Sequence, residues 1–274
     1  MAAQPGVRDR PPERLRRSPV QGRVVTDEPA ERPSPWRRLW RLVVESVVLV
    51  VLAVVVAAVL RVFVVQPFFV PSGSMQPTIE KHERIVVKKF GEVERGDVVV
   101  FEDPAAWLPP AERPERRTGV LGRGMEFVGL LPPSDKGYLV KRLIGLPGDH
   151  VVCCDGDGRL TVNDQPLAET DYLFTGNKPS EEPFDVVVPR DRVWVMGDHR
   201  LSSGDSRVHL GPEDRTAFVP MDNVVGRAFA AVWPIGDTRW LDRPTTFEAV
   251  PKPSKPAPGE PVVNAPPGRS DARR

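Results

Sequence analysis

One stretch of the chain is almost wholly apolar, whereas apolar and polar positions alternate within short runs farther along the chain. Residues 42–62 carry only two charged side chains, Glu45 and Arg61, and Leu42 to Leu60 is almost wholly aliphatic. Nineteen residues at about 1.5 Å each form a helix of about 29 Å, close to the thickness of the hydrocarbon core of a bilayer. We therefore predict a single membrane-spanning helix over residues 42–62. The later apolar run, Ala228 to Ile235, is too short for a second one.

Short runs rich in β-branched residues dominate the chain after residue 62, and no long amphipathic pattern occurs there. Glycine, proline or aspartate bounds most of these runs, as is typical of strands that end in turns. The runs are Glu83–Phe90, Asp97–Phe101, Tyr138–Leu146, Phe184–Val188, Arg192–Met196 and Val224–Val232. This pattern predicts a mainly β chain whose all-β domain covers residues 63–235.

Three segments do not fit the strand pattern. Residues 1–41 and 236–274 are rich in proline and poor in apolar residues, so we predict that both tails are disordered. Residues 104–137 form an insertion that is long for a loop in a compact domain. The apolar patch of this insertion, Met125 to Leu131, fits contact with a membrane surface and packing on the domain equally well.

The net charge of +1 hides a strongly basic N-terminal tail, with ten arginines, no lysine and five acidic residues in residues 1–41. Such a tail is compatible with nucleic-acid binding. However, Arg37, Arg38 and Arg41 adjoin the apolar run, and positive charge beside a span marks the cytoplasmic side. We therefore expect no nucleic-acid partner. We expect a single-pass protein of the cell membrane, with a cytoplasmic N-terminus and a β domain exported to the other side. A cleaved signal peptide is a poorer interpretation, because the run is too long and follows a long leader.

The two cysteines of the chain, Cys153 and Cys154, are adjacent. A disulfide between neighbours would strain the peptide and close no useful loop, so we predict buried or free thiols without a catalytic role. Neither a CxxC nor an HxxxH pair lies nearby in the sequence. We therefore predict no metal site and no cofactor.

Two polar residues stand in unusual surroundings. Ser74 lies in Pro-Ser-Gly-Ser-Met-Gln-Pro-Thr, residues 71–78, shortly after the predicted span. Lys141 lies between Leu139 and Leu143, which share one face of a strand by alternation. Taken alone, Ser74 fits a surface turn, and Lys141 fits a lysine that extends to the strand edge and keeps its charge in water. A nucleophilic serine needs a base, so the two residues become informative only together.

Four segments occur in a fixed order along the chain. They are residues 71–78, Arg95 to Phe101 (RGDVVVF), Lys141 to Asp149 (KRLIGLPGD) and Gly197 to Arg207 (GDHRLSSGDSR). Together they closely resemble the sequence blocks of bacterial type I signal peptidases, the membrane-bound serine proteases that use a Ser/Lys dyad. The resemblance implies a signal-peptidase-like catalytic domain with a β-rich cap over about residues 151–190.

The resemblance also implies roles for individual residues. Ser74 matches the nucleophile and Lys141 the general base. The Ser72 hydroxyl matches the group that joins the Ser74 backbone N–H in the oxyanion hole, and Ser203 matches the hydroxyl that orients the lysine. Six further residues match structural or substrate-pocket positions: the ion pairs Asp205–Arg207 and Asp198–Arg142, and the pocket walls Val70 and Val140.

The chemistry of the dyad depends on an uncharged lysine. An exposed lysine, with a pKa of about 10.4, is an ammonium ion at neutral pH, whereas a useful base needs a pKa near 7 to 8. Burial among aliphatic neighbours would lower the pKa of Lys141 in this way. His199 and Leu201 depart from the residues usual in the family. We still do not expect a Ser/His mechanism, because Lys141 is present.

The expected substrates are preproteins that still carry their signal peptides, cleaved after small residues in sites of the Ala-x-Ala type. They would bind in an extended form beside the lipid bilayer, and a contact with the secretion translocon stays open. Three alternatives differ in class. A soluble self-cleaving repressor would need a DNA-binding domain and no span. The other two are an inactive membrane-anchored binding module and a peptidase for one dedicated client.

Overall fold

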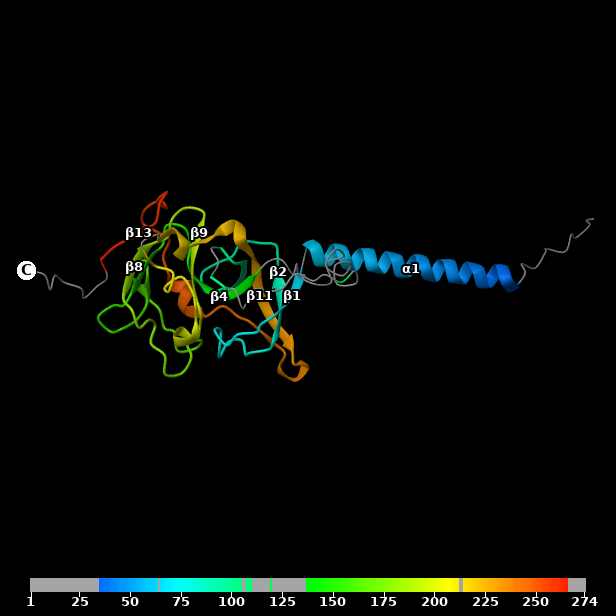
Figure 1. Cartoon of the computed structure of the whole chain (residues 1–274), viewed down its shortest axis with the longest axis horizontal. Coiled ribbons are helices and arrows are strands. Elements are labelled where there is room, and N and C mark those ends of the chain that lie inside the picture. Colours follow the sequence, from blue (N-terminus) through cyan, green and yellow to red (C-terminus); the bar gives the residue numbers. More distant parts are fainter. Residues whose placement is uncertain are drawn as a thin grey trace, which may run out of the picture. The chain divides into compact units, whose positions relative to one another are not determined.

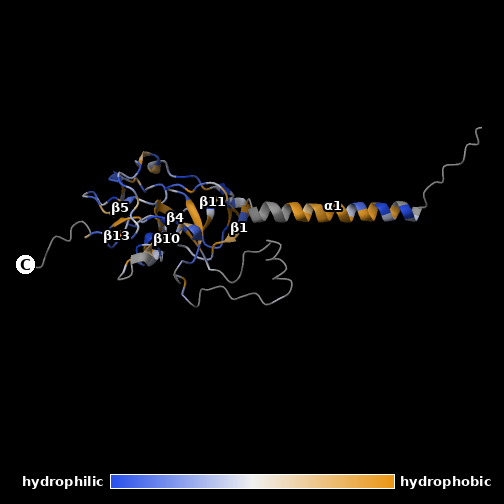
Figure 2. Ribbon diagram, turned by 90° about the horizontal axis from the view of Figure 1, so that it is seen from above, coloured by the Kyte–Doolittle hydropathy of each residue, from blue (hydrophilic) through white to orange (hydrophobic). Residues whose placement is uncertain are grey.

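The structure, a computed structural model, describes residues 35–63, 65–104, 107–109, 119, 137–211 and 214–265. The first element is the helix α1, Pro35–Phe63. Its window Leu39–Val56 has a mean hydropathy of 2.5 and is long and apolar enough to cross a membrane. Figure 2 shows polar residues at the start of α1 and apolar residues along its middle. The predicted span of 42–62 thus lies within a longer helix.

The start of α1 corrects one prediction. Proline at the first helical position loses no intrahelical hydrogen bond, and its fixed φ suits the start of a helix, which accounts for Pro35. Residues 35–41 are therefore helical, and the prediction that the whole of residues 1–41 is disordered is wrong for this part. Residues 1–34 lie outside the described residues.

The larger sheet has eight antiparallel strands among the described residues, in the order β1-β2-β11-β3-β4-β9-β10, with β12 paired to β11. The bounds are β1 Val65–Phe69, β2 Arg84–Lys88, β3 Val98–Glu102, β4 Tyr138–Gly145, β9 Arg192–Met196, β10 Val219–Pro220, β11 Val224–Trp233 and β12 Arg239–Trp240. In this sheet β4 pairs with β3 from Tyr138 to Arg142 and with β9 from Arg142 to Gly145. The mainly β fold expected from the sequence is confirmed.

A second antiparallel sheet has the strand order β13-β8-β5-β6-β7. The bounds are β5 His150–Cys153, β6 Thr161–Val162, β7 Gln165–Pro166, β8 Phe184–Val187 and β13 Val262–Val263. Figure 1 shows β8 and β13 at the end of the domain away from β1 and β2. We call residues 150–187, which contain four of these strands, the cap.

One strand packs against both sheets. β9 belongs to the larger sheet, yet its residues Trp194 and Met196 are fully buried in the same apolar cluster as Val151 and Phe184 of the cap. The indole ring of Trp194 lies 5.1 Å from the ring of Phe184. Burial of large aromatic side chains contributes strongly to stability, so this cluster holds the cap on the larger sheet.

The C-terminal segment is ordered where the sequence predicts a disordered tail. Residues 241–265, which we call the C-terminal strap, contain the short 3₁₀ helix Thr245–Ala249 and the strand β13, which pairs with β8. Leu241, Phe247 and Val250 are buried. The prediction for residues 236–274 is therefore wrong up to residue 265, and residues 266–274 lie outside the described residues. The strap is polar on average, so its composition does not indicate the few apolar residues that anchor it.

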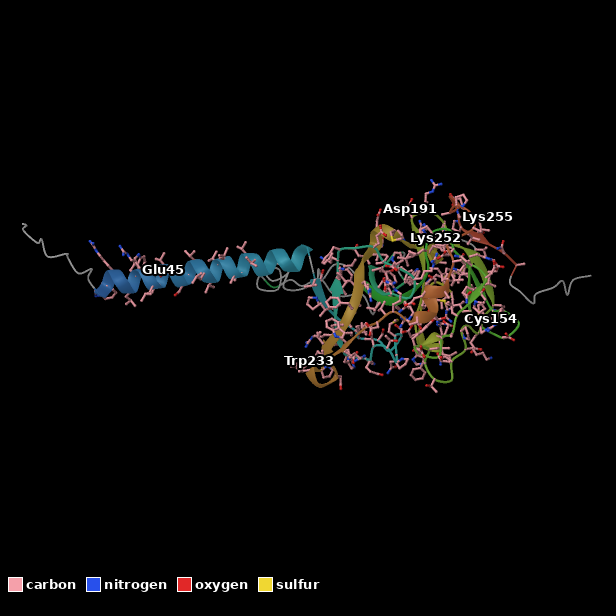
Figure 3. The ribbon with its side chains drawn as sticks, turned by 180° about the vertical axis from the view of Figure 1, so that it is seen from behind. Glu45, Cys154, Asp191, Trp233, Lys252 and Lys255 are labelled. Atoms are coloured by element: carbon pink, nitrogen blue, oxygen red, sulfur yellow. A yellow bond between two sulfur atoms is a disulfide. The ribbon has the colours of Figure 1, made fainter. Side chains whose placement is uncertain are left out.

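The cysteine prediction is wrong in one respect. Cys153 and Cys154 are joined by a disulfide at the end of β5, and Cys153 is buried, as expected. Figure 3 labels Cys154 in the cap. The loop-closure argument concerns how much a bridge restricts the unfolded chain, and it does not decide whether two adjacent thiols pair.

The predicted insertion, residues 104–137, is described only in small part. Trp107 within it is buried, its ring stacks on His209 at 4.3 Å, and its indole N–H donates to the Thr216 carbonyl. The start of the insertion therefore packs on the domain. The apolar patch Met125 to Leu131 lies outside the described residues, so both interpretations of it stay open.

Candidate active site

Ser74 lies in a tight loop that follows β1. The backbone N–H of Val70 donates to Glu83 and the N–H of His82 donates to Val70, so the two ends of the loop are held together. Met75, next to the serine, is fully buried. The apolar side chain thus anchors the loop in the core, and Ser74 itself is only 5% exposed.

Lys141 lies on β4 and reaches Ser74. Its Nζ atom is 2.8 Å from Ser74 Oγ and 3.1 Å from the Val140 carbonyl oxygen. The residue is 3% exposed. The two residues are 67 positions apart, and the pairing of β4 with β3 and β9 brings them together. The structure therefore rejects the alternative of a lysine that extends into water.

The surroundings of Lys141 favour the uncharged amine. Burial lowers the pKa of Lys141 to about 8, because the ammonium form loses its hydration. The carboxylates of Asp205 and Asp198 oppose this shift, and the positive charge of Arg207 adds to it. A pKa of about 8 lies near the range in which a general base works at neutral pH.

Ser72 lies beside Ser74. Its hydroxyl oxygen is 3.3 Å from Ser74 Oγ, and the residue is exposed on the open side of the loop.

The predicted hydrogen bond from Ser203 to Lys141 is not formed in the structure. Ser203 Oγ is buried without a hydrogen-bond partner of normal geometry among the described residues. The hydroxyl lies against Gly197, where an added Cβ atom would overlap it and would lie 2.6 Å from the Ser74 carbonyl oxygen. Ser203 is thus next to the backbone of Ser74, rather than bonded to the Lys141 amine.

Both predicted ion pairs are present and buried. Arg142 donates to both oxygens of Asp198, at 2.8 and 2.6 Å, and Arg207 donates to both oxygens of Asp205, at 2.9 and 2.8 Å. Burial raises the pKa of Asp205, but the bonds and charge of Arg207 outweigh this effect and hold the pKa below its usual value. Asp205 also accepts a hydrogen bond from the backbone N–H of Gly197.

Residues 197–200 contact the backbone of Ser74, which sequence analysis missed. The backbone N–H of His199 donates to the Ser74 carbonyl oxygen at 3.0 Å. Gly197 provides the close approach described above, because it has no side chain. The Gly-Asp-His-Arg sequence indicated the block, but nothing in it identifies which backbone groups contact Ser74.

The ring of His199 does not act on Ser74. It stacks on Phe174, with ring centroids 4.0 Å apart, and its Nδ1 atom has no hydrogen-bond partner in the described part of the chain. The side-chain partners of Ser74 Oγ among the described residues are Lys141 and Ser72. The geometry thus agrees with a lysine, rather than a histidine, as the base.

The two predicted pocket walls lie in one apolar cluster. Val70 is buried, and Val140 packs against the same cluster, which also contains Met75. Both residues are close to the dyad in sequence, since Val140 precedes Lys141 and Val70 lies four residues before Ser74. Within the described residues, no three His, Cys, Asp or Glu side chains are grouped to hold a metal ion.

Comparison with known proteins finds the family described as signal peptidase, peptidase S26, which matches residues 43–233. A protein named "Probable signal peptidase I" from Mycobacterium leprae is 33% identical, over 84% of this chain and 86% of that protein. A "Signal peptidase I" from Mycobacterium tuberculosis is 39% identical, over 78% of each. A crystal structure of a signal peptidase I from Enterococcus faecalis covers 50% of this chain at 22% identity and a TM-score of 0.31.

The match to the family extends over more than half of the chain and includes α1 from residue 43 onward and both members of the Ser74–Lys141 pair. The two mycobacterial relatives align over most of their own length as well as most of this chain. The chain therefore belongs to the signal peptidase family, peptidase S26.

Proposed function

We propose that this protein is a signal peptidase I, a membrane-anchored serine endopeptidase that removes N-terminal signal peptides from exported preproteins. Ser74 is the nucleophile and Lys141 the general base. The observation that carries this proposal is the 2.8 Å approach of Lys141 Nζ to Ser74 Oγ within a buried site. The names of the relatives agree with this activity.

The proton transfers follow from the position of the amine. The neutral Lys141 takes the proton of the Ser74 hydroxyl as Ser74 Oγ attacks the scissile carbonyl carbon, and it then gives this proton to the leaving amine. A water molecule next attacks the acyl-enzyme, again with Lys141 as the base, and Ser74 is released. Burial makes this cycle feasible near neutral pH, because it lowers the pKa of Lys141 to about 8.

The developing oxyanion needs hydrogen-bond donors. We propose that the backbone N–H of Ser74 and the hydroxyl of Ser72 donate to it. Support comes from the position of the Ser72 hydroxyl, 3.3 Å from Ser74 Oγ on the exposed side of the loop. Removal of one such donor typically reduces the rate about 100- to 1000-fold.

The substrate would bind as an added strand. Toward its start, β4 pairs with β3 on one side, whereas β9 covers the other side only from Arg142 onward. The backbone of Leu139 and Val140 thus has one side without a strand partner among the described residues, and an extended peptide fits such an edge. Val70 and Val140 would restrict the neighbouring side-chain pockets to small residues, which agrees with cleavage after Ala-x-Ala.

The helix α1 would anchor the enzyme in the lipid bilayer. We propose that the N-terminus is cytoplasmic, because Arg37, Arg38 and Arg41 precede the apolar window, and that the catalytic domain is exported. Preproteins emerging from the secretion translocon would then meet the active site while their signal peptides are still in the bilayer.

A cleavage assay tests the proposal. The full chain in detergent should release the mature part of a preprotein with an Ala-x-Ala site, and mass spectrometry should place the cut after the second alanine. Ser74→Ala and Lys141→Met should each reduce turnover more than about 1000-fold. The exposed residues Ser254 and Lys178 provide matched controls, since Ser254→Ala and Lys178→Met should cleave normally.

Two results would contradict the proposal. One is a Lys141→Met variant with near-normal turnover, which would remove the lysine from the mechanism. The other is inhibition of the wild-type protein by a metal chelator, because the dyad supplies both nucleophile and base without a metal ion.

A further inference from the structure

A turn of the cap reaches the arginine that follows the catalytic lysine. Arg142 uses its donors on Asp198, on the Gly96 carbonyl and on the Thr78 hydroxyl. Its guanidinium plane lies on the ring of Tyr172, with the central carbon 4.3 Å from the ring centroid. Tyr172 comes from the turn after β7, and it is 2% exposed. One face of the buried cation is therefore covered by an aromatic side chain of the cap.

The hydroxyl of Tyr172 continues the chain of contacts. It donates to Glu169 at 2.8 Å, and burial keeps the phenol neutral by raising its pKa well above the usual value. Glu169 pairs with Arg200 at 2.5 Å, and Arg200 Nε donates to the Gly197 carbonyl oxygen at 2.8 Å. Gly197 is the residue that lies directly against the backbone of Ser74.

Tyr172 thus connects to both members of the dyad. On one side it contacts Arg142, the neighbour of Lys141 in β4. On the other side it leads through Glu169 and Arg200 to the segment that binds the Ser74 carbonyl. Groups that are buried, charged and hydrogen-bonded have little freedom to move without loss of their partners.

We propose that Tyr172 is a positioning residue of the active site, and that the cap sets the distance between Lys141 Nζ and Ser74 Oγ through it. The inference rests on the proposed function. The carboxylate of Asp198 strengthens the connection, because it accepts from both Arg142 and Thr78, four residues after the nucleophile. If the ring is lost, Arg142 and Asp198 shift, and the lysine strand and the serine loop shift with them.

The expected defect is in kcat. The backbone edge of Leu139 and Val140, which we assign to substrate binding, is not part of this network, so KM should change little. A small change in the distance between base and nucleophile is enough to slow the chemical step strongly, by as much as about 100-fold for a shift of about 1 Å.

Two substitutions separate the ring from the hydroxyl. Tyr172→Phe keeps the aromatic face under Arg142 and removes one hydrogen bond, while Glu169 stays paired with Arg200, so kcat should fall less than about fivefold. Tyr172→Met keeps an apolar side chain of adequate length and removes the aromatic face, so kcat should fall at least about tenfold with KM within about twofold. Recovery of activity by the phenylalanine variant is the signature of positioning by the ring.

Phe184→Leu is the matched control. Phe184 is as buried as Tyr172 and lies in the same apolar cluster, but its ring packs on Trp194 rather than on Arg142. Thermal unfolding of the full-length variants in detergent shows whether the stability losses match. Phe184→Leu should lose stability to a degree similar to Tyr172→Met and keep kcat within about twofold of wild type.

Three outcomes would overturn the inference: equal loss of kcat in Tyr172→Met and Phe184→Leu, loss of activity in Tyr172→Phe as large as in Tyr172→Met, or a defect of Tyr172→Met confined to KM. Each of these requires an active wild-type protein. They are therefore distinct from failure of the proposed function, in which the wild type would not cleave or Ser74→Ala would remain active.

Discussion

The surroundings of Lys141 determine whether its amine is charged. A lysine in water is an ammonium ion, and a site for a neutral amine has to make that ion unfavourable. The structure does this by burial, while two nearby carboxylates partly counteract the effect and Arg207 adds to it. Both carboxylates are paired with arginines. These ion pairs limit the negative charge that the amine experiences.

The same burial predicts a dependence of stability on pH. Lys141 has a pKa of about 8 in the folded protein against a usual value of 10.5. Between these values the unfolded chain binds a proton that the folded chain has released, so stability rises with pH in this window. Below about pH 8 the full penalty applies, about 3 kcal/mol for a shift of this size.

We therefore expect Lys141→Met to be more stable than wild type at pH 7, by up to about 3 kcal/mol. The advantage should shrink as the pH rises from 8 and should vanish near pH 10.5. Thermal unfolding at pH 7 and pH 10.5 measures it, with the exposed Lys178→Met as control. A constant difference between Lys141→Met and wild type across this range would show that the amine is not buried as described.

At the residue scale, the Ser74–Lys141 pair and the two ion pairs could be predicted from the sequence. Their residues lie in the four segments that resemble those of bacterial type I signal peptidases. The sequence did not predict the connection through Tyr172 and Glu169. Their local sequence, Glu-Thr-Asp-Tyr, reads as an ordinary turn, and their importance comes from contact with Arg142 and Arg200 far away in the chain. The predicted bond of Ser203 failed for a similar reason, since a motif does not determine where a hydroxyl points.

The C-terminal strap is the element that sequence analysis misjudged most. Arg243 binds Asp97 with two donors, and the Asn163 side chain donates to the Pro251 carbonyl oxygen in the middle of the strap. Toward its end, the backbone N–H of Asn264 donates to Asp185 of β8. The strap thus joins the larger sheet to the cap through isolated anchor points, which an average over composition cannot reveal.

Phe247 should be the main apolar anchor of the strap. The residue is 4% exposed, and it packs beside Gly96, where an added Cβ atom would lie 2.6 Å from its ring. We expect Phe247→Ala to cost about 3 to 5 kcal/mol of unfolding free energy, which lowers the Tm by about 10 °C. Val263→Ala, at an exposed position of β13, should have an effect below about 1 kcal/mol. Equal Tm values for Phe247→Ala and wild type would mean that the strap is not held as described.

At the scale of the whole molecule, the division into an apolar helix and a β domain follows directly from periodicity. Nineteen residues that are almost all aliphatic permit little besides a span or a buried helix, and short β-branched runs permit little besides strands. The order of the strands in the sheet, in contrast, does not follow from periodicity. The position of β11 between β2 and β3 depends on contacts more than 100 residues apart, which local patterns do not encode.

Attachment to the membrane is a property of the full chain. We expect the full chain to remain in the membrane fraction after extraction at high pH, because α1 is long enough to cross the bilayer. Deletion of residues 1–63 should release the protein, and deletion of residues 1–34 should not. Immunoblots of the pellet and supernatant measure this. Release of the full chain would exclude α1 as a stable span.

The pKa of the Lys141 amine can be measured directly by ¹³C NMR. The full chain, labelled at lysine Cε, is titrated in detergent. Comparison with Lys141→Met assigns the signal. We predict a midpoint near pH 8, as expected for a buried amine next to Ser74. A midpoint near 10.5 would contradict the assignment of Lys141 as the general base.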